Sequence, residues 1–161
     1  MQIPKLDPAV IEAYKKLDST SISDALDRLG IPGGLYGIKP VTPGVVMCGQ
    51  AFTVRYVPCG EVKGTVGDFL DDVEPGQVCV LDNGGRDYCT VWGDIMAMAA
   101  SMKEIAGTLI YGVCRDVKDV RAIRYPSSRW ATTWSPARTG GGRRGQRAGH
   151  RGGNSRSARG I

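Results

Sequence analysis

The sequence has no long hydrophobic run. No apolar stretch approaches the roughly 20 residues that a helix needs to span a bilayer. The first residues, Met-Gln-Ile-Pro-Lys-Leu-Asp-Pro, also lack the pattern of a secretory signal peptide. We therefore expect a cytoplasmic protein without a membrane segment. Its 161 residues suit one domain with its own core.

Paired cysteines are also absent. The five cysteines are scattered, no two of them form a CxxC pair, and they occupy positions 48, 59, 79, 89 and 114. Most of them lie in apolar, strand-like stretches. This placement predicts buried free thiols and argues against disulfides or a zinc site.

Acidic residues are missing from residues 126–161. This segment contains eight arginines, so the net charge of +5 combines +8 here with −3 in residues 1–125. The basic character of the chain therefore belongs to its last segment alone. Taken at face value, an acid-free Arg/Gly-rich segment is typical of a disordered nucleic-acid-binding tail.

The first part of the chain predicts two helices and a strand region. Apolar residues have helical spacing over residues 6–18, and a second short helix follows, with a Ser/Thr cap at its start and Gly30 at its end. Residues 31–44 are rich in Gly and Pro and indicate a loop. Residues 45–57 predict one or two strands with a bend at Gly49.

The second part predicts alternating strands and helices. A short helix is expected from Thr65 to Leu70, and the Pro-Gly of residues 74–77 favours a type II turn. Further elements follow in order: a strand at 78–83, a helix from about 95 that Gly107 ends, a strand at 108–113 and a helix at 116–123. This alternation predicts an α/β fold with a partly parallel sheet and a right-handed crossover.

Arg115 and Asp116 follow the strand at 108–113. The carboxyl end of a parallel strand is where such sheets usually bind ligands. A guanidinium suits a carboxylate, and an adjacent carboxylate suits a hard divalent metal. The pair therefore indicates a site for a small carboxylic acid and a metal. The alternative interpretation is a surface ion pair at a strand end, and on the pair alone it is the favoured one.

A second loop is expected at the same sheet edge. Residues 84–94 follow the strand at 78–83 and lead into a helix that begins near Asp94. The free N–H groups of the first turn, around Asp94, Ile95 and Met96, can bind an anion. Asp94 can either cap its own helix or orient a metal-bound water, and the sequence favours neither role.

Two motifs resemble a known family. Trp92-Gly-Asp-Ile-Met-Ala-Met-Ala-Ala and Gly112-Val-Cys-Arg-Asp, with their separation, are similar to the RraA-like (regulator of ribonuclease E activity A) family. Ser21-Ile-Ser-Asp-Ala-Leu-Asp-Arg-Leu-Gly and Gly49-Gln-Ala-Phe-Thr-Val fit it too, so the resemblance covers residues 10–125. That family includes 4-hydroxy-4-methyl-2-oxoglutarate / 4-carboxy-4-hydroxy-2-oxoadipate aldolases, and some members are labelled demethylmenaquinone methyltransferases.

The resemblance implies a swivelling α/β/α sandwich that assembles as homotrimers or hexamers. It implies that Arg115 binds the pyruvate carboxylate and that Asp116 ligates Mg²⁺ or Mn²⁺, largely through water. Gly93 and Asp94 would support this site, and the amides of Ile95 and Met96 would contact pyruvate. The implied chemistry is metal-assisted retro-aldol cleavage, with oxaloacetate decarboxylation as a side activity. The second pair, Arg86-Asp87, does not match the motif and is interpreted as a surface or trimer contact.

The basic segment has a second explanation. Trp130 to Thr139, back-translated and moved by one base, can encode V-G-N-Y-M-V-T-G-K-D, which is similar to the family. We hypothesise that base deletions changed the reading frame, so the α/β domain spans residues 1–125 and a disordered tail spans 126–161. The original segment would supply the last strands and an acidic residue for a neighbouring subunit's site. A chain without it is expected to be marginally stable, and its activity can be absent.

The sequence offers three candidate functions for this chain. The first is a divalent-metal pyruvate aldolase acting on a small 2-oxo acid. The second is a non-catalytic regulator of an RNA-degrading enzyme, because that branch of the family has the same fold. Nucleic-acid binding through the arginines ranks last, because the segment resembles a translation of the wrong frame. Methyl transfer has no support, since the sequence has no suitable glycine-rich cofactor loop.

Overall fold

The computed structural model describes residues 4–58, 64–130 and 146–149, and it divides into two compact units between Gly37 and Ile38. The first unit contains helices α1 (Pro8–Lys15) and α2 (Ser19–Arg28). Neither helix contains a buried residue. No helix in the described ranges is long and apolar enough to cross a bilayer.

Local chemistry sets the ends of α2. The cap is Asp18, whose carboxylate accepts from the Ser21 amide at 2.6 Å, and not the Ser/Thr expected from the sequence. At the other end Gly30 has a φ of 67°, and Ile31 N donates to Leu26 O at 2.9 Å. This left-handed residue after the last turn forms a Schellman stop, as the sequence predicts for Gly30.

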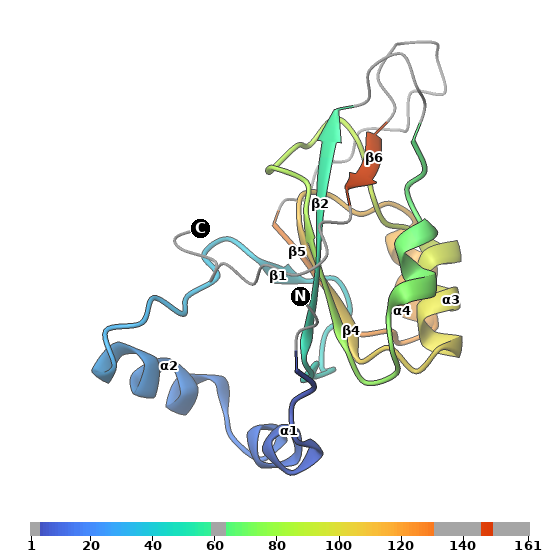
Figure 1. Ribbon diagram of the computed structural model, residues 1–161. Helices are drawn as coiled ribbons and strands as arrows, with labels where there is room; N and C mark the ends of the chain where they lie inside the picture. The colour runs from blue at the N-terminus through green and yellow to red at the C-terminus, as the bar shows by residue number, and fades with distance from the viewer. Residues whose placement is uncertain (1–3, 59–63, 131–145, 150–161) are drawn as a thin grey trace. The chain divides into compact units, whose positions relative to one another are not determined.

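The second unit is built on one mixed sheet of strand order β1-β5-β4-β3-β2-β6 (Figure 1). The strands are β1 (Lys39–Pro40), β2 (Ala51–Pro58), β3 (Val78–Asp82), β4 (Gly107–Tyr111), β5 (Ser127–Arg129) and β6 (Gln146–Gly149). The pairs β2–β3, β3–β4 and β4–β5 are parallel, whereas β1–β5 and β2–β6 are antiparallel. The predicted α/β class with a partly parallel sheet is confirmed.

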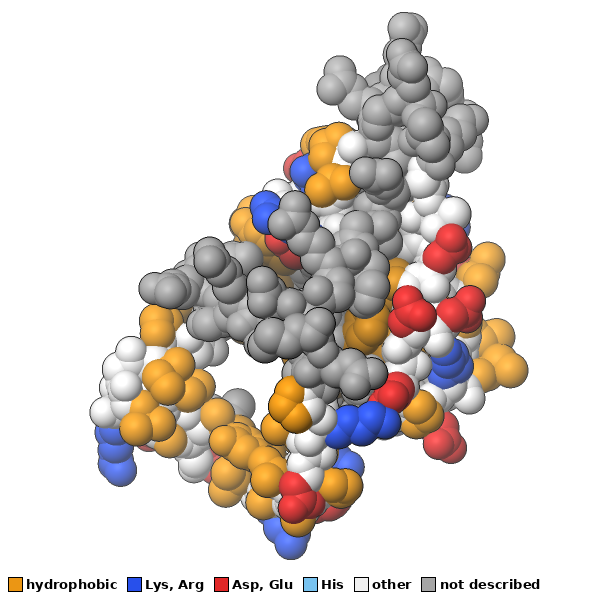
Figure 2. All heavy atoms as spheres, in the orientation of Figure 1, with side chains coloured by type: hydrophobic (Ala, Val, Ile, Leu, Met, Phe, Trp, Pro, Cys, Tyr) orange, Lys and Arg blue, Asp and Glu red, His pale blue; other side chains and the backbone are white. Residues whose placement is uncertain are grey.

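Three helical elements accompany this sheet: the 3₁₀ helix η1 (Asp68–Asp72), α3 (Asp94–Met102) and α4 (Val117–Ala122). Figure 1 shows them together on one side of the strands. The core contains Tyr56, Leu81 and Ile110 from the strands with Phe69 and Ala97 from the helical side. Figure 2 shows acidic side chains on the outer surface of this helical side, where η1 carries three aspartates.

Several predicted boundaries need correction. Residues 45–50 are not strand, because β2 begins at Ala51, and the bend at Gly49 precedes it. The expected loop 31–44 contains the short β1, and the expected helix 65–70 is the later η1. Helix α3 ends before Gly107, because Glu104 takes a φ of 56° and Ile105 N donates to Ala100 O. A non-glycine residue therefore forms this Schellman stop.

The sheet extends past the predicted boundary at residue 125. β5 pairs with β4 on one side and β1 on the other, and Ser127 is buried. The sequence places all three residues of β5, Ser127–Arg129, in the predicted tail. Most of the predicted tail, residues 131–145 and 150–161, lies outside the described residues. The reading-frame hypothesis is therefore still a prediction.

Candidate functional site

The loop before α3 lies beside the segment that follows β4. Thr90 and Val113 form a parallel bridge between these two segments. Two residues further on, Arg115 N donates to Trp92 O at 3.1 Å. Backbone contacts therefore bring Gly93 and Arg115 to the same sheet edge, as the strand–helix–strand pattern predicts.

Gly93 contacts both charged residues of the Arg-Asp motif. A Cβ atom on Gly93 would lie 2.8 Å from Asp116 Oδ2 and 3.2 Å from Arg115 Nε. The backbone angles of Gly93, φ −159° and ψ −167°, are ordinary extended values. A side chain at this position would therefore require Asp116 and Arg115 to shift, whereas the backbone conformation itself does not require glycine.

Arg115 and Asp116 form an ion pair. The distance from Arg115 Nε to Asp116 Oδ2 is 2.9 Å, and the side chains are 53% and 35% exposed. In the described chain the guanidinium has no other partner, so its two Nη groups are available to a ligand. The surface-pair interpretation is correct about exposure, but the pair also packs against the buried backbone of Gly93.

Asp116 has an uncommon backbone conformation. Its φ of 53° and ψ of 37° are left-handed, a region in which Asp and Asn are enriched. It precedes α4, but its carboxylate makes no capping hydrogen bond. The helix therefore does not use this carboxylate, which is positioned by Arg115.

The first turn of α3 is partly occupied. The cap of α3 is Gly93, which has no side-chain capping bond, and Asp94 is the first helical residue, whose Oδ1 accepts from the Ile95 amide at 2.8 Å. The Ile95 amide, expected to contact pyruvate, already has a partner. The amides of Asp94 and Met96 lie in the same first turn, where helix geometry leaves N–H groups without carbonyl partners. Gly93 connects this turn to the Arg115–Asp116 pair.

A groove of about 340 Å³ lies between α3 and α4. It is lined by Asp94, Ile95 and Met98 from α3, by Asp119 and Ala122 from α4, and by Ile123, which follows α4. Its lining is mostly apolar with one carboxylate from each helix, and it does not include Arg115 or Asp116. The groove therefore adjoins the candidate site at Asp94 and Ile95.

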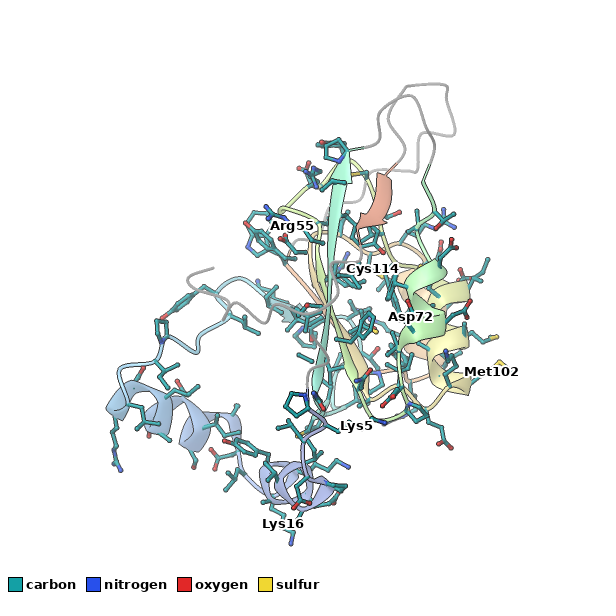
Figure 3. The ribbon with its side chains drawn as sticks, in the orientation of Figure 1. Lys5, Lys16, Arg55, Asp72, Met102 and Cys114 are labelled. Carbon is teal, nitrogen blue, oxygen red and sulfur yellow. The ribbon has the colours of Figure 1, made fainter. Side chains whose placement is uncertain are left out.

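Cys114 limits the chemistry beside the motif (Figure 3). Burial raises the pKa of its thiol to about 11, although Arg129 and Arg115 lower it and Asp116 raises it further. The Sγ atom donates to Arg115 O at 3.1 Å. A protonated, hydrogen-bonded thiol is neither a good nucleophile nor a ready metal ligand.

The residues present fit a metal held mainly by water. The described part of the chain has no group of three or more His, Cys, Asp or Glu side chains able to cage an ion. Mg²⁺ commonly binds through one or two carboxylates and keeps several waters. Asp116, with its partly exposed carboxylate, suits that mode and does not suit an all-protein cage.

Two arginines differ from their predicted places. Arg86 is half-buried, and its Nη1 donates to Asn83 O at 2.8 Å, so it supports the loop after β3 and is not a free surface residue. The predicted tail includes Arg129, but Arg129 belongs to β5. Continuing the strand–helix alternation past α4 is the signal that would have placed Arg129 in the sheet.

Comparison with known proteins identifies the family. The family model RraA-like, Aldolase/RraA, matches residues 19–150. The chain belongs to the RraA-like family. Protein DlpA of Legionella pneumophila is 41% identical over 123 residues, which are 74% of this chain and 20% of that protein. A Halalkalibacterium halodurans protein with the name "Putative 4-hydroxy-4-methyl-2-oxoglutarate aldolase" is 30% identical over 72% of this chain and 53% of its own length.

Solved structures with a similar fold also match this chain. An uncharacterized protein from Pseudomonas syringae is 38% identical, with a TM-score of 0.78 over 93% of this chain and 66% of that one. Streptomyces coelicolor RraAS2, described as an unusual member of the RNase ES inhibitor RraA family, has a TM-score of 0.76 at 24% identity, over 89% of this chain and 72% of its own. This RraA-like chain spans about half or less of the two curated relatives named above.

Proposed function

We propose that this RraA-like chain carries the pyruvate-binding part of a divalent-metal-dependent aldolase. The observation that supports the proposal is the Arg115–Asp116 pair packed on Gly93, with the Nη groups of Arg115 available. Two parallel N–H groups can bind the carboxylate of a 2-oxo acid bidentately. The proposed substrates are 4-hydroxy-4-methyl-2-oxoglutarate and related 4-hydroxy-2-oxo acids.

In the proposed reaction, the bond between C3 and C4 of the substrate breaks. The C4 hydroxyl loses its proton to form a carbonyl, and C3 gains a proton to give pyruvate. Arg115 holds the carboxylate next to the 2-oxo group, and Asp116 would hold Mg²⁺ or Mn²⁺ through its carboxylate and water. When bound, the metal supplies Lewis-acid polarisation of the 2-oxo group. Asp94 orients solvent at the edge of the site.

Pyruvate release tests the proposal. We expect the chain to release pyruvate from 4-hydroxy-4-methyl-2-oxoglutarate and from oxaloacetate in the presence of Mg²⁺, and EDTA to abolish the release. Arg115→Gln should reduce kcat/KM by about 10²-fold, because it removes the positive charge and the two parallel N–H donors of the guanidinium. Arg124→Gln, at an exposed arginine, is the matched control. Release that is independent of metal, or equal in wild type and Arg115→Gln, would contradict the proposal.

A second candidate is a non-catalytic regulator of an RNA-degrading enzyme. The likeness to the Streptomyces RNase ES inhibitor family supports it through the fold. Pull-down of an RNase E-type enzyme, with no pyruvate release, would favour this candidate. Light scattering of the chain, as used in the pyruvate-release assay and in the pull-down, should show the proposed homotrimer or hexamer.

A further inference from the structure

Arg129 lies at the same edge of the sheet as the candidate site. It is the last residue of β5, and its register partner on the parallel β4 is Ile110. Register partners on neighbouring strands point to the same face of a sheet. Ile110 is fully buried in the core shared with α3 and α4. The side chain of Arg129 therefore starts on the face of the sheet that carries this core.

The guanidinium of Arg129 reaches the segment that carries the motif. Its Nη1 donates to Cys114 O at 3.4 Å, and Cys114 directly precedes Arg115. Arg129 is therefore bonded to the residue that directly precedes the Arg115–Asp116 ion pair.

The positive charge of Arg129 is not balanced within the described chain. The guanidinium of Arg129 forms no ion pair there, and the carbonyl of Cys114 is its one hydrogen-bond partner. The nearby carboxylate, Asp116, is already paired with Arg115. A guanidinium has five N–H donors, so most of those on this half-buried side chain have no partner among the described residues. A half-buried cation with unused donors favours an anionic ligand.

We propose that Arg129 binds the distal carboxylate of a dicarboxylic 2-oxo acid whose other carboxylate is held by Arg115. The assignment of the first carboxylate to Arg115 rests on the proposed function. With two arginines at one sheet edge, a dicarboxylate gains a second charge-assisted contact that a monocarboxylate lacks. Arg129 is therefore a specificity residue that separates dicarboxylic from monocarboxylic 2-oxo acids. This role requires that β5 is read in frame, so that any change of frame begins at Trp130, where the quoted back-translation starts.

Binding of two ligands tests this role. Calorimetry in Mg²⁺ compares 2-oxoglutarate, which has two carboxylates and no 4-hydroxyl, with pyruvate. For Arg129→Gln we expect the affinity for 2-oxoglutarate to fall about tenfold or more and that for pyruvate to change less than about twofold. Arg129→Lys, which retains the charge, should recover part of the loss. Arg124→Gln removes an equal charge at an exposed position and should change neither affinity.

The outcomes separate this inference from the aldolase proposal. Equal weakening of both ligands in Arg129→Gln would show a structural role and overturn the inference, as would unchanged binding of 2-oxoglutarate or no binding by the wild type. Selective loss of 2-oxoglutarate binding in a chain that cleaves no 4-hydroxy-2-oxo acid would support the inference and contradict the aldolase. Pyruvate release by the wild type, with an unchanged ligand preference in Arg129→Gln, would support the aldolase proposal and contradict this inference.

Discussion

Asp116 Oδ2 lies 2.8 Å from the point that a Cβ atom on Gly93 would occupy. These residues are far apart in the sequence, and no backbone strain at Gly93 indicates the contact. The ion pair of Arg115 and Asp116 therefore depends on a missing side chain in the opposite loop. Its geometry is determined by the packing of two loops as well as by the motif itself.

Gly93→Ala is expected to displace the ion pair. The new methyl group would approach the Asp116 carboxylate too closely, so Arg115 and Asp116 must both move. A misplacement of about 1 Å can cost about 10²-fold in rate, and we expect a loss of that order in pyruvate release. Gly67→Ala is the matched control, because its Cβ would lie 3.7 Å from Met96 Cε. Equal activities for the two variants would show that Gly93 does not position the pair.

Asp116→Asn tests the metal site without disturbing the backbone. Asn tolerates the left-handed conformation of residue 116, and an exposed ion pair contributes little to stability. The melting temperature should therefore stay within about 2 °C of the wild type. The apparent affinity for Mg²⁺, from the metal dependence of pyruvate release, should fall about tenfold or more. Asp119→Asn, in the first turn of α4, should change neither quantity.

The sequence predicts the elements of the site better than their contacts. The strand–helix alternation predicts that Gly93 and Arg115 share one sheet edge, because parallel strands end on the same side. It cannot predict that the Ile95 amide donates to Asp94, since this choice depends on side-chain rotamers in the folded chain. Helix α3 ends at a left-handed Glu104, where the sequence offers a glycine only at Gly107. Arg129 was missed because the arginine-rich composition of its segment concealed a three-residue strand.

Tyr125→Phe tests a buried polar contact in the core. The hydroxyl groups of Tyr125 and Thr108 share a hydrogen bond of 2.9 Å, and both residues are buried. Removing one hydroxyl leaves the other with an incomplete set of partners, which should lower the free energy of unfolding by about 1–3 kcal/mol. Urea denaturation measures the change. Tyr88→Phe, at a side chain that is 76% exposed, should change it by less than about 0.5 kcal/mol.

Asp18 predicts a pH dependence of helix α2. Hydrogen bonds from the Thr20 hydroxyl and the Ser21 amide lower the pKa of Asp18 to about 2. Because the folded pKa is below the unfolded value of about 3.9, the stabilisation is fully present above that value and is lost as the pH falls toward 2. The NMR shift of the Ser21 amide should report this titration. Asp18→Asn keeps a capping oxygen and should abolish it; a midpoint near 4 in the wild type would contradict the prediction.

The thiols of Cys79 and Cys114, which are buried in the described structure, are expected to resist alkylation. Burial raises the pKa of Cys79 to about 12 and that of Cys114 to about 11, so both remain protonated at pH 8. Since the thiolate is the reactive form, iodoacetamide should modify them only after unfolding. Mass spectrometry with and without denaturant measures the difference, and Cys48, which is half-buried, serves as the internal comparison. Rapid native modification of Cys114 would show that the segment before Arg115 opens.

The pairing of β1 with β5 has a consequence for how the chain folds. Lys39 pairs with Arg129, so most of the sequence lies between two neighbouring strands. Contacts between such distant segments are slow to form, because a long loop must close first. During synthesis, the edge that carries Arg115 can become complete only after residue 129 has left the ribosome. Partly made chains therefore expose the edge of β4, and the rate of folding depends on how soon β5 covers it.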